Sequence, residues 1–501
     1  MQKNTLGNVN VAVGYNSLME NTTGLRNVSV GFTALNQNIS GQNNTAVGTF
    51  ALENNTIGSN NVGIGYTALQ NTQGNNTVAV GYKSLQANTT GSANTALGHE
   101  ALKVNTIGSE NVAVGNGALN NNTTGSSNTA VGTYVLNNND IGSNNIAIGR
   151  NTLSNNNSGN ENVAVGNYAL FDNLLGNKNT AVGHNALFSN TIGSQNTAVG
   201  RDALRDNTLG IENVAIGSSA LQQNVTGYSN TAVGNFSLRL NGTGNNNTAV
   251  GRLSLENNTD GRSNTAVGES TMKQNVNGQD NTAVGLGSLM NNVVGSYNTT
   301  IGYGSGDGII GGSRNVIIGN NADASGDNAF NQIVIGEGAI GTGDNEIVLG
   351  NTSITAIKSN VTSITAYSDE RIKREISDNA LGLSFINKLR PVRYKLKNPA
   401  DYPSEILEER FLSIPGSGPG NVGYIRPQDD ENYYDGLIAQ EVKSAMDEVG
   451  IEWSGWSENK GNGKQAVQYG ALTVPLIKAV QELSSEILKL KEEIKNLKSE
   501  L

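Results

Sequence analysis

A short unit repeats along most of this chain. A glycine preceded by Asn-x-Ala-Val, or a close variant, recurs every seventeen residues from Gly14 to Gly336, apart from one step of sixteen between Gly65 and Gly81. The missing residue falls in the polar stretch between those two glycines, where a deletion is tolerated. Self-similarity at such a period is typical of solenoids, in which each unit stacks on its neighbours. We call the recurring residue the anchor glycine and count positions of the repeat from it.

Each position within the repeat has its own character. The residue before the anchor glycine is always aliphatic, as at Val13, and two residues earlier stands Val or Thr, as at Val11, usually with Ala between them. This alternation predicts a short strand with one bulky face and one small face. An apolar residue follows four positions after the anchor, as at Leu18, and an Asn precedes the anchor by four, as at Asn10. We expect these Asn side chains to stack as an amide ladder.

One repeat therefore predicts one coil of a parallel β-roll or β-helix, and the chain as a whole is expected to be a mainly β, fibrous protein. A single coil cannot bury its own apolar stripe, so stacked neighbours must create the core. At ~4.8 Å per coil, about twenty coils form a rod on the order of 100 Å long. Because the apolar face of the strand is narrow, we expect association between chains to bury it.

The repeat changes character after Gly302. The Leu four positions after the anchor glycine disappears, and the stretch EIVLGNTSITAIKSNVTSITAYS alternates Ile, Val and Thr, which predicts extended strand. The residues that take the place of this Leu are Gly306, Asp323 and Ile340. We interpret residues 1–302 as a repeat shaft and residues 303–367 as a β neck.

Composition and charge exclude several classes of partner. The 63 glycines and the aromatic content of only 5% indicate a thin, repetitive object. A net charge of −10 argues against binding to nucleic acid. No apolar run approaches the ~20 residues that span a bilayer, and the start of the chain lacks the pattern of a signal peptide, so membrane insertion is not expected. Cysteine is absent, which excludes disulfides and thiolate metal sites, and we expect no cofactor.

Ring side chains recur directly after the anchor glycine. They are Tyr15, Phe32, Tyr66 and Tyr82. Such rings can stack on sugars, but a structural aromatic ladder is the favoured interpretation. His99 and His184 occupy the same position five coils apart, too far from each other for one metal ion.

The composition switches at Ser368 to Lys, Arg, Glu and Leu, with helical spacing at pairs such as Ile372 and Ile376. The chain ends in a heptad pattern that predicts a coiled coil over residues 476–501. Its core positions are Leu476, Val480, Leu483, Ile487, Leu490, Ile494, Leu497 and Leu501. Alternating Ile or Val with Leu favours a coiled coil of two helices by the coiled-coil rules. We nevertheless expect the shaft to set the number of chains at three, so that the chain forms a homotrimer.

Four ordered motifs fill the C-terminal part. They are SDERIKREI (368–376), NKLRPVRYKLK (387–397), DGLIAQEV (435–442) and VQYGALTVPLIKAVQEL (467–483). They resemble the endosialidase-type intramolecular chaperone, a self-processing peptidase domain found behind phage tail spikes and fibres. The resemblance implies a small α+β chaperone domain over residues 368–475, followed by the coiled coil. It also implies that this domain trimerises the fibre during folding and then cuts itself off.

The resemblance carries specific residues onto this chain. The scissile bond would join Tyr367 and Ser368, with Ser368 as nucleophile and Lys373 as general base of an autoproteolytic serine peptidase. Supporting positions would be Asp369, Gln440 and Glu441.

The proposed pair of residues is chemically reasonable without the resemblance. A Ser hydroxyl becomes a nucleophile when a neighbouring base removes its proton, and a lysine whose pKa is lowered by burial can be that base. Ser368 and Lys373 are five residues apart, about 140° around an ideal helix, so they cannot meet within one regular helix. We therefore expect Ser368 to lie on a strand or turn. The carbonyl that precedes it is attacked by the Ser368 hydroxyl of the same chain or of another chain, and the sequence leaves both alternatives open.

The NTAVGxxAL repeats themselves resemble the head repeats of trimeric autotransporter adhesins and the shafts of phage tail fibres. We expect a virion tail fibre that is made in the host cytoplasm and binds a host cell-surface receptor, with a glycan the favoured ligand. Because repeats begin within ten residues of Met1, a virion attachment domain is expected to be missing or supplied by another protein. A bacterial trimeric adhesin is one alternative, but the sequence predicts no export signal. A polysaccharide-degrading spike is another, but the repeats offer no recurring paired carboxylates.

Overall fold

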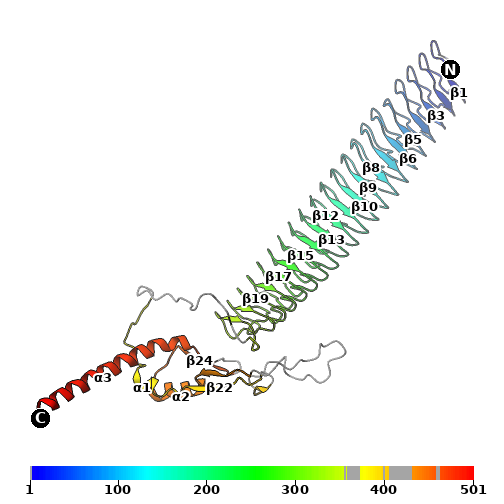
Figure 1. Ribbon diagram of the computed structural model, residues 1–501. Helices are drawn as coiled ribbons and strands as arrows, with labels where there is room; N and C mark the ends of the chain where they lie inside the picture. The colour runs from blue at the N-terminus through cyan, green and yellow to red at the C-terminus, as the bar shows by residue number, and fades with distance from the viewer. Residues whose placement is uncertain are drawn as a thin grey trace. The chain divides into compact units, whose positions relative to one another are not determined.

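The computed structural model describes residues 3–354, 357, 373–398, 401–404, 431–458 and 463–500. These fall into two compact units, Met1–Leu349 and Gly350–Leu501. Each unit is described by itself (Figure 1).

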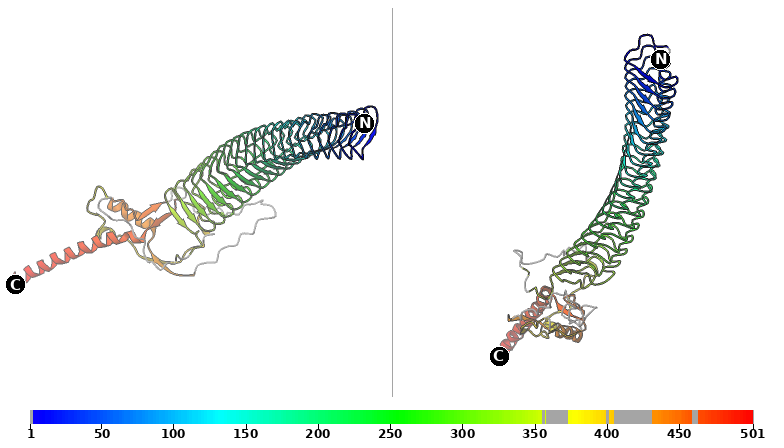
Figure 2. Two further views of the ribbon diagram at one scale, coloured as in Figure 1. Left: turned by 90° about the horizontal axis from the view of Figure 1, so that it is seen from above. Right: turned by 90° about the vertical axis from the view of Figure 1, so that its right-hand side faces the viewer.

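The first unit is a solenoid whose coils stack along one axis and share a parallel sheet of 21 strands (Figures 1 and 2). Each three-residue strand pairs with the next strand in the chain, one repeat away, so that Val11 lies opposite Val28. The strands are β1 (Val11–Val13), β2 (Val28–Val30), β3 (Thr45–Val47), β4 (Val62–Ile64), β5 (Val78–Val80), β6 (Thr95–Leu97), β7 (Val112–Val114), β8 (Thr129–Val131), β9 (Ile146–Ile148), β10 (Val163–Val165), β11 (Thr180–Val182), β12 (Thr197–Val199), β13 (Val214–Ile216), β14 (Thr231–Val233), β15 (Thr248–Val250), β16 (Thr265–Val267), β17 (Thr282–Val284), β18 (Thr299–Ile301), β19 (Val316–Ile318), β20 (Ile333–Ile335) and β21 (Ile347–Leu349). The predicted parallel solenoid of seventeen-residue coils is confirmed.

The two predicted faces of the strand differ in burial. The small middle residue points into the coil and is fully buried, as at Ala46 and Ala79. The larger residues on either side point outward, and Ile64 and Leu97 keep 38% and 48% of their surface exposed. The bulky face therefore forms two columns along the outside of the solenoid. The column of last strand residues is aliphatic throughout, whereas the column of first strand residues mixes Val and Ile with Thr.

The Leu residues that fill the core have a strained backbone conformation. The Leu four positions after the anchor glycine is fully buried, as at Leu18 and Leu35, yet both have φ near +48° and +47°, in the left-handed region. That conformation costs about 1–2 kcal/mol for a residue with a Cβ, whereas burying a Leu side chain contributes about 1.5–3 kcal/mol. The Leu18 N–H also donates to the Ala34 carbonyl of the next coil at 3.0 Å. Burial and this hydrogen bond together offset the strain.

The anchor glycine is required by the close approach of neighbouring coils. Gly14 has φ +125°, and a Cβ placed on it would lie 2.4 Å from the carbonyl oxygen of Gly31 in the next coil. A side chain at this position would therefore separate the coils. This explains why the glycine recurs in register with the repeat.

Two buried Asn ladders run along the solenoid. In the predicted ladder, Oδ1 of Asn27 accepts from the N–H of Asn44 at 2.9 Å, while its Nδ2 donates to the Gly41 carbonyl at 2.8 Å. A second ladder was not predicted. There Nδ2 of Asn38 donates to Oδ1 of Asn21 at 2.7 Å and to the Gly41 carbonyl at 3.0 Å. Both ladders satisfy polar groups that burial would otherwise leave unpaired.

The coils continue beyond Gly302. β19, β20 and β21 extend the same sheet, and Val334 in the middle of β20 is fully buried. The first part of the neck interpreted over residues 303–367 is therefore further solenoid, because β-branched strand residues persist after the core Leu is lost. Residues 358–367, its last part, lie outside the described residues.

The second unit is a small α+β fold around Phe385, Val442, Met446 and Trp453, with the Phe385 and Trp453 rings 5.7 Å apart and edge to face. Its elements are α1 (Leu383–Ile386), β22 (Val392–Tyr394), β23 (Tyr434–Gly436), α2 (Ala439–Val449), β24 (Trp456–Glu458), β25 (Gln465–Val467), η4 (Tyr469–Leu472) and α3 (Thr473–Glu500). The helix that the spacing around Ile376 predicted does not form. Residues 373–382 contain no helix, and Glu375 has φ +56°.

The helix α3 carries the predicted heptad on 28 residues. Its core positions from Leu476 to Leu497 remain exposed in the single chain, between 43% at Ile487 and 64% at Val480. Within the described ranges, no helix combines the length and apolar character needed to cross a membrane.

Candidate functional site

The second and third C-terminal motifs meet in a two-stranded antiparallel sheet. β22 pairs with β23, so that Val392 lies opposite Gly436 and Tyr394 opposite Tyr434. The chain then enters α2 directly after the third motif's Leu437 and Ile438. Pairing of these two strands therefore fixes where α2 begins.

Tyr469 joins the fourth motif to this sheet. Its hydroxyl oxygen accepts the N–H of Leu437 at 2.8 Å. A Cβ on Gly436 would lie 2.4 Å from that hydroxyl and 3.2 Å from the Tyr394 ring, so only glycine permits this approach. Burial, and then the neighbouring Tyr469, raise the pKa of Tyr394.

An ion pair connects the second motif to the start of α2. The Arg390 guanidinium donates two hydrogen bonds to the Glu441 carboxylate, with 3.1 Å between Nε and Oε2. The hydrogen bond from Arg390 lowers the pKa of Glu441, and the same contact raises the pKa of Arg390. Glu441 lies in the first turn of α2, where the helix dipole also favours a carboxylate. Gln440, beside it, is exposed.

Two further contacts hold the helices of this unit. The Glu482 carboxylate of α3 accepts the backbone N–H of Leu383 at 2.7 Å, which satisfies a free N–H group at the start of α1. The indole Nε1 of Trp456 donates to the Ala439 carbonyl at 3.1 Å. The long helix α3 is therefore bound to the same domain that carries the motifs.

An apolar pocket of about 370 Å³ lies where the second, third and fourth motifs meet. Its lining includes Ile386, Leu389, Pro391, Leu437, Leu472 and Leu476. Leu476 is also the first core position of the heptad, so the pocket and the heptad share this residue.

The structure describes only part of the predicted catalytic set. Tyr367, Ser368 and Asp369 lie outside the described residues. Lys373 is the first residue described after them, and its side chain is exposed in the single chain. The distance between the proposed nucleophile and base is therefore not part of the described geometry.

Sequence reasoning missed Arg390 and Tyr469. Both stand inside the quoted motifs, but their roles come from contacts across 51 and 32 residues of chain. The charges of Arg390 and Glu441 were visible in the sequence, whereas their pairing required the fold of β22 against β23.

Residues 368–451 match the family model for the chaperone of endosialidase. The match begins at Ser368, the first residue of the first motif, and ends at Ile451, just after α2. It gives the chain a C-terminal intramolecular chaperone of the tail-spike type, from a peptidase family. No curated protein matches the chain.

Proposed function

We propose that the chain is a homotrimeric tail fibre or spike that attaches a virion to a host cell surface. Its C-terminal domain trimerises the fibre during folding and then cuts the bond between Tyr367 and Ser368. The observation that carries this proposal is the position of the chaperone match, which starts directly behind the solenoid and its neck. A separate attachment protein would link the fibre to the virion.

The outside of the solenoid supports association between chains. The last residue of each strand is aliphatic and at least partly exposed in all 21 strands, and a contiguous apolar surface of this length marks an interface. The exposed heptad of α3 likewise needs partner helices to bury Leu483 and Leu490. Three chains joined at both surfaces would cover the apolar area that one chain leaves in water.

The cleavage step uses groups of the chain alone. Lys373 takes the proton of the Ser368 hydroxyl, whose oxygen then attacks the carbonyl carbon of Tyr367. The carbon–nitrogen bond breaks as its nitrogen takes the proton from Lys373 and leaves as the amine of Ser368. Water then hydrolyses the ester between the Tyr367 carbonyl carbon and the Ser368 oxygen, which frees the Tyr367 carboxylate and the Ser368 hydroxyl. Since Lys373 is exposed in the single chain, packing of the three domains would supply the dry surroundings that a general-base lysine needs.

Mass spectrometry of the intact expressed protein tests the cleavage. We expect a fragment that ends at Tyr367 and a second that begins at Ser368, together with full-length chains in Ser368→Ala and Lys373→Ala. Asp378→Asn, at an exposed position of the same segment, is the control and should be cut as wild type is. Cleavage of both dyad variants at the same bond would show that the assignment is wrong.

A further inference from the structure

The coils of the solenoid differ from one another at surface positions of the repeat, and aromatic residues gather at four of them. The strand triplets, the core Leu and the buried Asn positions are nearly constant from coil to coil. The first, second, fifth and sixth positions after the anchor glycine vary, and so do the ninth, eleventh and twelfth. We call the first four of these positions the variable face, because they carry most of the rings. They hold every Phe and Tyr between Gly14 and Gly302 except Tyr228 and Tyr297, and both histidines of the chain. Residues that the fold does not require, gathered on one face of a solenoid, indicate a binding face.

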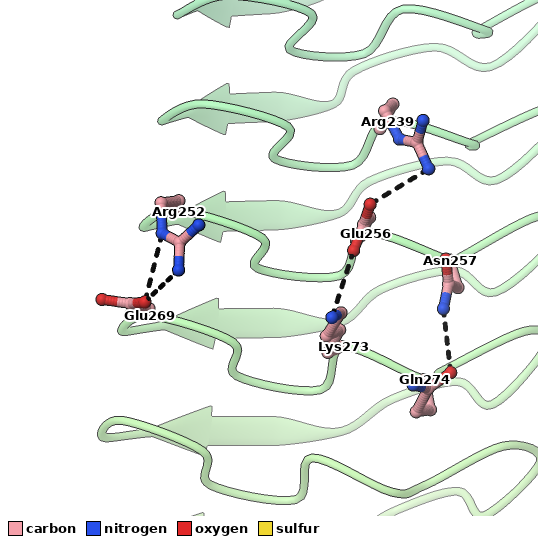
Figure 3. Close-up of polar contacts among 7 residues, drawn as sticks. All are labelled: Arg239, Arg252, Glu256, Asn257, Glu269, Lys273 and Gln274. Carbon is pink, nitrogen blue, oxygen red and sulfur yellow. Dashed lines mark hydrogen bonds and ion pairs between the residues drawn. The ribbon is translucent and has the colours of Figure 1, made fainter.

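Side chains on this face contact their neighbours in adjacent coils. Figure 3 shows a column in which Glu256 lies between Arg239 and Lys273, at 3.0 Å and 3.7 Å, beside an Arg252–Glu269 pair at 2.7 Å. In the first coils, the first and second positions after the anchor glycine hold a line of rings. Its ring centroids are 5.0–6.0 Å apart and its members are Tyr15, Phe32, Phe50, Tyr66, Tyr82 and His99.

A different arrangement of rings occurs in the coils that follow Gly166 and Gly183. Tyr168 contacts Phe171 at 5.7 Å, His184 at 6.2 Å and Phe188 at 6.3 Å, and Phe171 stacks on Phe188 at 5.1 Å. These rings come from the first, second and fifth positions after the anchor glycines of two successive coils, so they form a patch and not a single file. His184 is exposed, and the other three rings are partly exposed.

Charged groups of both signs border this patch. Arg150 lies in the coil before it and Asp172 beside Phe171, and two Arg–Asp pairs lie in the coil after it. In that coil, the Arg205 guanidinium donates to both oxygens of Asp206 at 2.8 Å and 2.7 Å, and Arg201 lies 3.0 Å from Asp202. The border therefore offers hydrogen-bonding groups without a strong net charge. That chemistry does not suit a nucleic acid, which needs unpaired Lys and Arg.

We propose that the ring patch of Tyr168, Phe171, His184 and Phe188 binds an uncharged, linear carbohydrate chain. The C–H faces of a sugar pack on aromatic rings, and its hydroxyls bond to a polar border. The patch spans two coils, about 10 Å along the solenoid, which suits one or two sugar units and is too small for a protein interface of ~800 Å² per partner. The chain of sugars would run along the columns, because each further coil presents side chains at the same positions.

This inference rests on the proposed attachment function and names its ligand class and place. The probe is a printed array of bacterial surface polysaccharides, to which the full-length protein is applied after expression and self-processing. We expect wild type to bind at least one uncharged polysaccharide, and Tyr168→Ser/Phe188→Ser to weaken that binding by ~10-fold or more, since the sugar loses two of the rings on which it packs. Tyr66→Ser/Tyr82→Ser removes two rings from the single file on the same face and is the matched control.

The outcomes separate this inference from the proposed function. Binding that survives the patch variant, that falls equally in the control variant, or that is absent from wild type would overturn the ring patch as the site. Gel migration of the same samples reports self-cleavage and detergent-resistant trimers, and so tests the fibre and its chaperone independently. Tyr168→Phe keeps the ring and the local packing, and it should retain most of the binding.

Discussion

The side chain of Gln73 takes the place of a peptide group in the coil that is one residue short. Its Oε1 accepts from the N–H and the hydroxyl of Thr56 at 3.0 Å and 2.6 Å, and its Nε2 donates to the Asn54 carbonyl at 2.6 Å. In a complete coil a backbone carbonyl does this, as when Thr22 donates its N–H and its hydroxyl to Ile39 at 3.1 Å and 2.9 Å. The deletion is therefore compensated by one amide side chain.

Replacing Gln73 by Leu should open this turn. The Thr56 N–H would lose its acceptor, at a cost of about 1–3 kcal/mol, and we expect faster hydrogen exchange in residues 54–57 measured by mass spectrometry. Gln42→Leu, at an exposed position of a complete coil, is the control and should leave exchange there unchanged. In the Gln73→Leu variant, one Thr inserted directly after Thr72 restores the seventeen-residue step between anchor glycines. This insertion should restore the protection of residues 54–57 from hydrogen exchange. If the insertion gives none, Gln73 does not replace a peptide group.

The seventeen-residue period of the sequence predicts most of the structure of this first unit. The features that it does not predict lie where the period is broken. Coil count, strand position and the core Leu follow from spacing alone. The role of Gln73 does not, because its partners lie one coil away and a single deletion resembles a harmless loop change. In the C-terminal unit no period exists outside the heptad of α3, so contacts such as Tyr469 with Leu437 depend on a tertiary arrangement that motif order does not specify.

The Arg390–Glu441 pair should affect self-cleavage more than stability. Both groups are exposed, and an exposed ion pair contributes little to stability because water screens it. Yet it fixes the first turn of α2, where Gln440 lies, so Arg390→Gln should slow the appearance of the cleaved fragment on gels while unfolding is nearly unchanged. Lys388→Gln is the matched control, since Lys388 pairs with Glu448 at 2.5 Å at the other end of α2. Equal cleavage rates in both variants would count against a role for the pair.

Asp323 makes the last coils sensitive to pH. Burial raises the pKa of its carboxyl to about 6, nearby Asp307 also raises it, and N–H groups of Ala324 and Gly308 partly oppose the rise. The folded chain thus binds a proton that the unfolded chain has lost above about pH 4. Stability from this group is full below about pH 4 and is lost as pH rises through 6.

We therefore expect Asp323→Asn to flatten the pH dependence of the last coils. In wild type, proteolytic resistance of residues 302–349 should increase from pH 7.5 to pH 4.5, by up to about 2–3 kcal/mol in local opening free energy. The variant should lose that increase. Asp327→Asn, an exposed carboxylate in the same coil, should behave as wild type does. A pH profile shared by wild type and Asp323→Asn would assign the effect to other carboxylates.

The near identity of the coils makes the alignment of three shafts ambiguous. A slip of one chain by seventeen residues restores almost every contact between aliphatic columns and loses only those at the ends, so the shaft specifies its own register poorly. The C-terminal unit is not repetitive, and α3 is tied to it by the contact of Glu482 with Leu383. Three such units would align the chain ends before the coils associate.

Residues 1–367 expressed alone should therefore aggregate or assemble out of register. The same segment released from the full-length protein should instead be a detergent-resistant trimer, because many stacked coils make unfolding slow once the register is set. Gel electrophoresis with and without heating, together with native mass measurement, distinguishes the two samples, and Ser368→Ala provides an uncut trimer for comparison. If the truncated chain forms the same resistant trimer unaided, the C-terminal domain is not needed for folding of this fibre, whether or not it cuts itself.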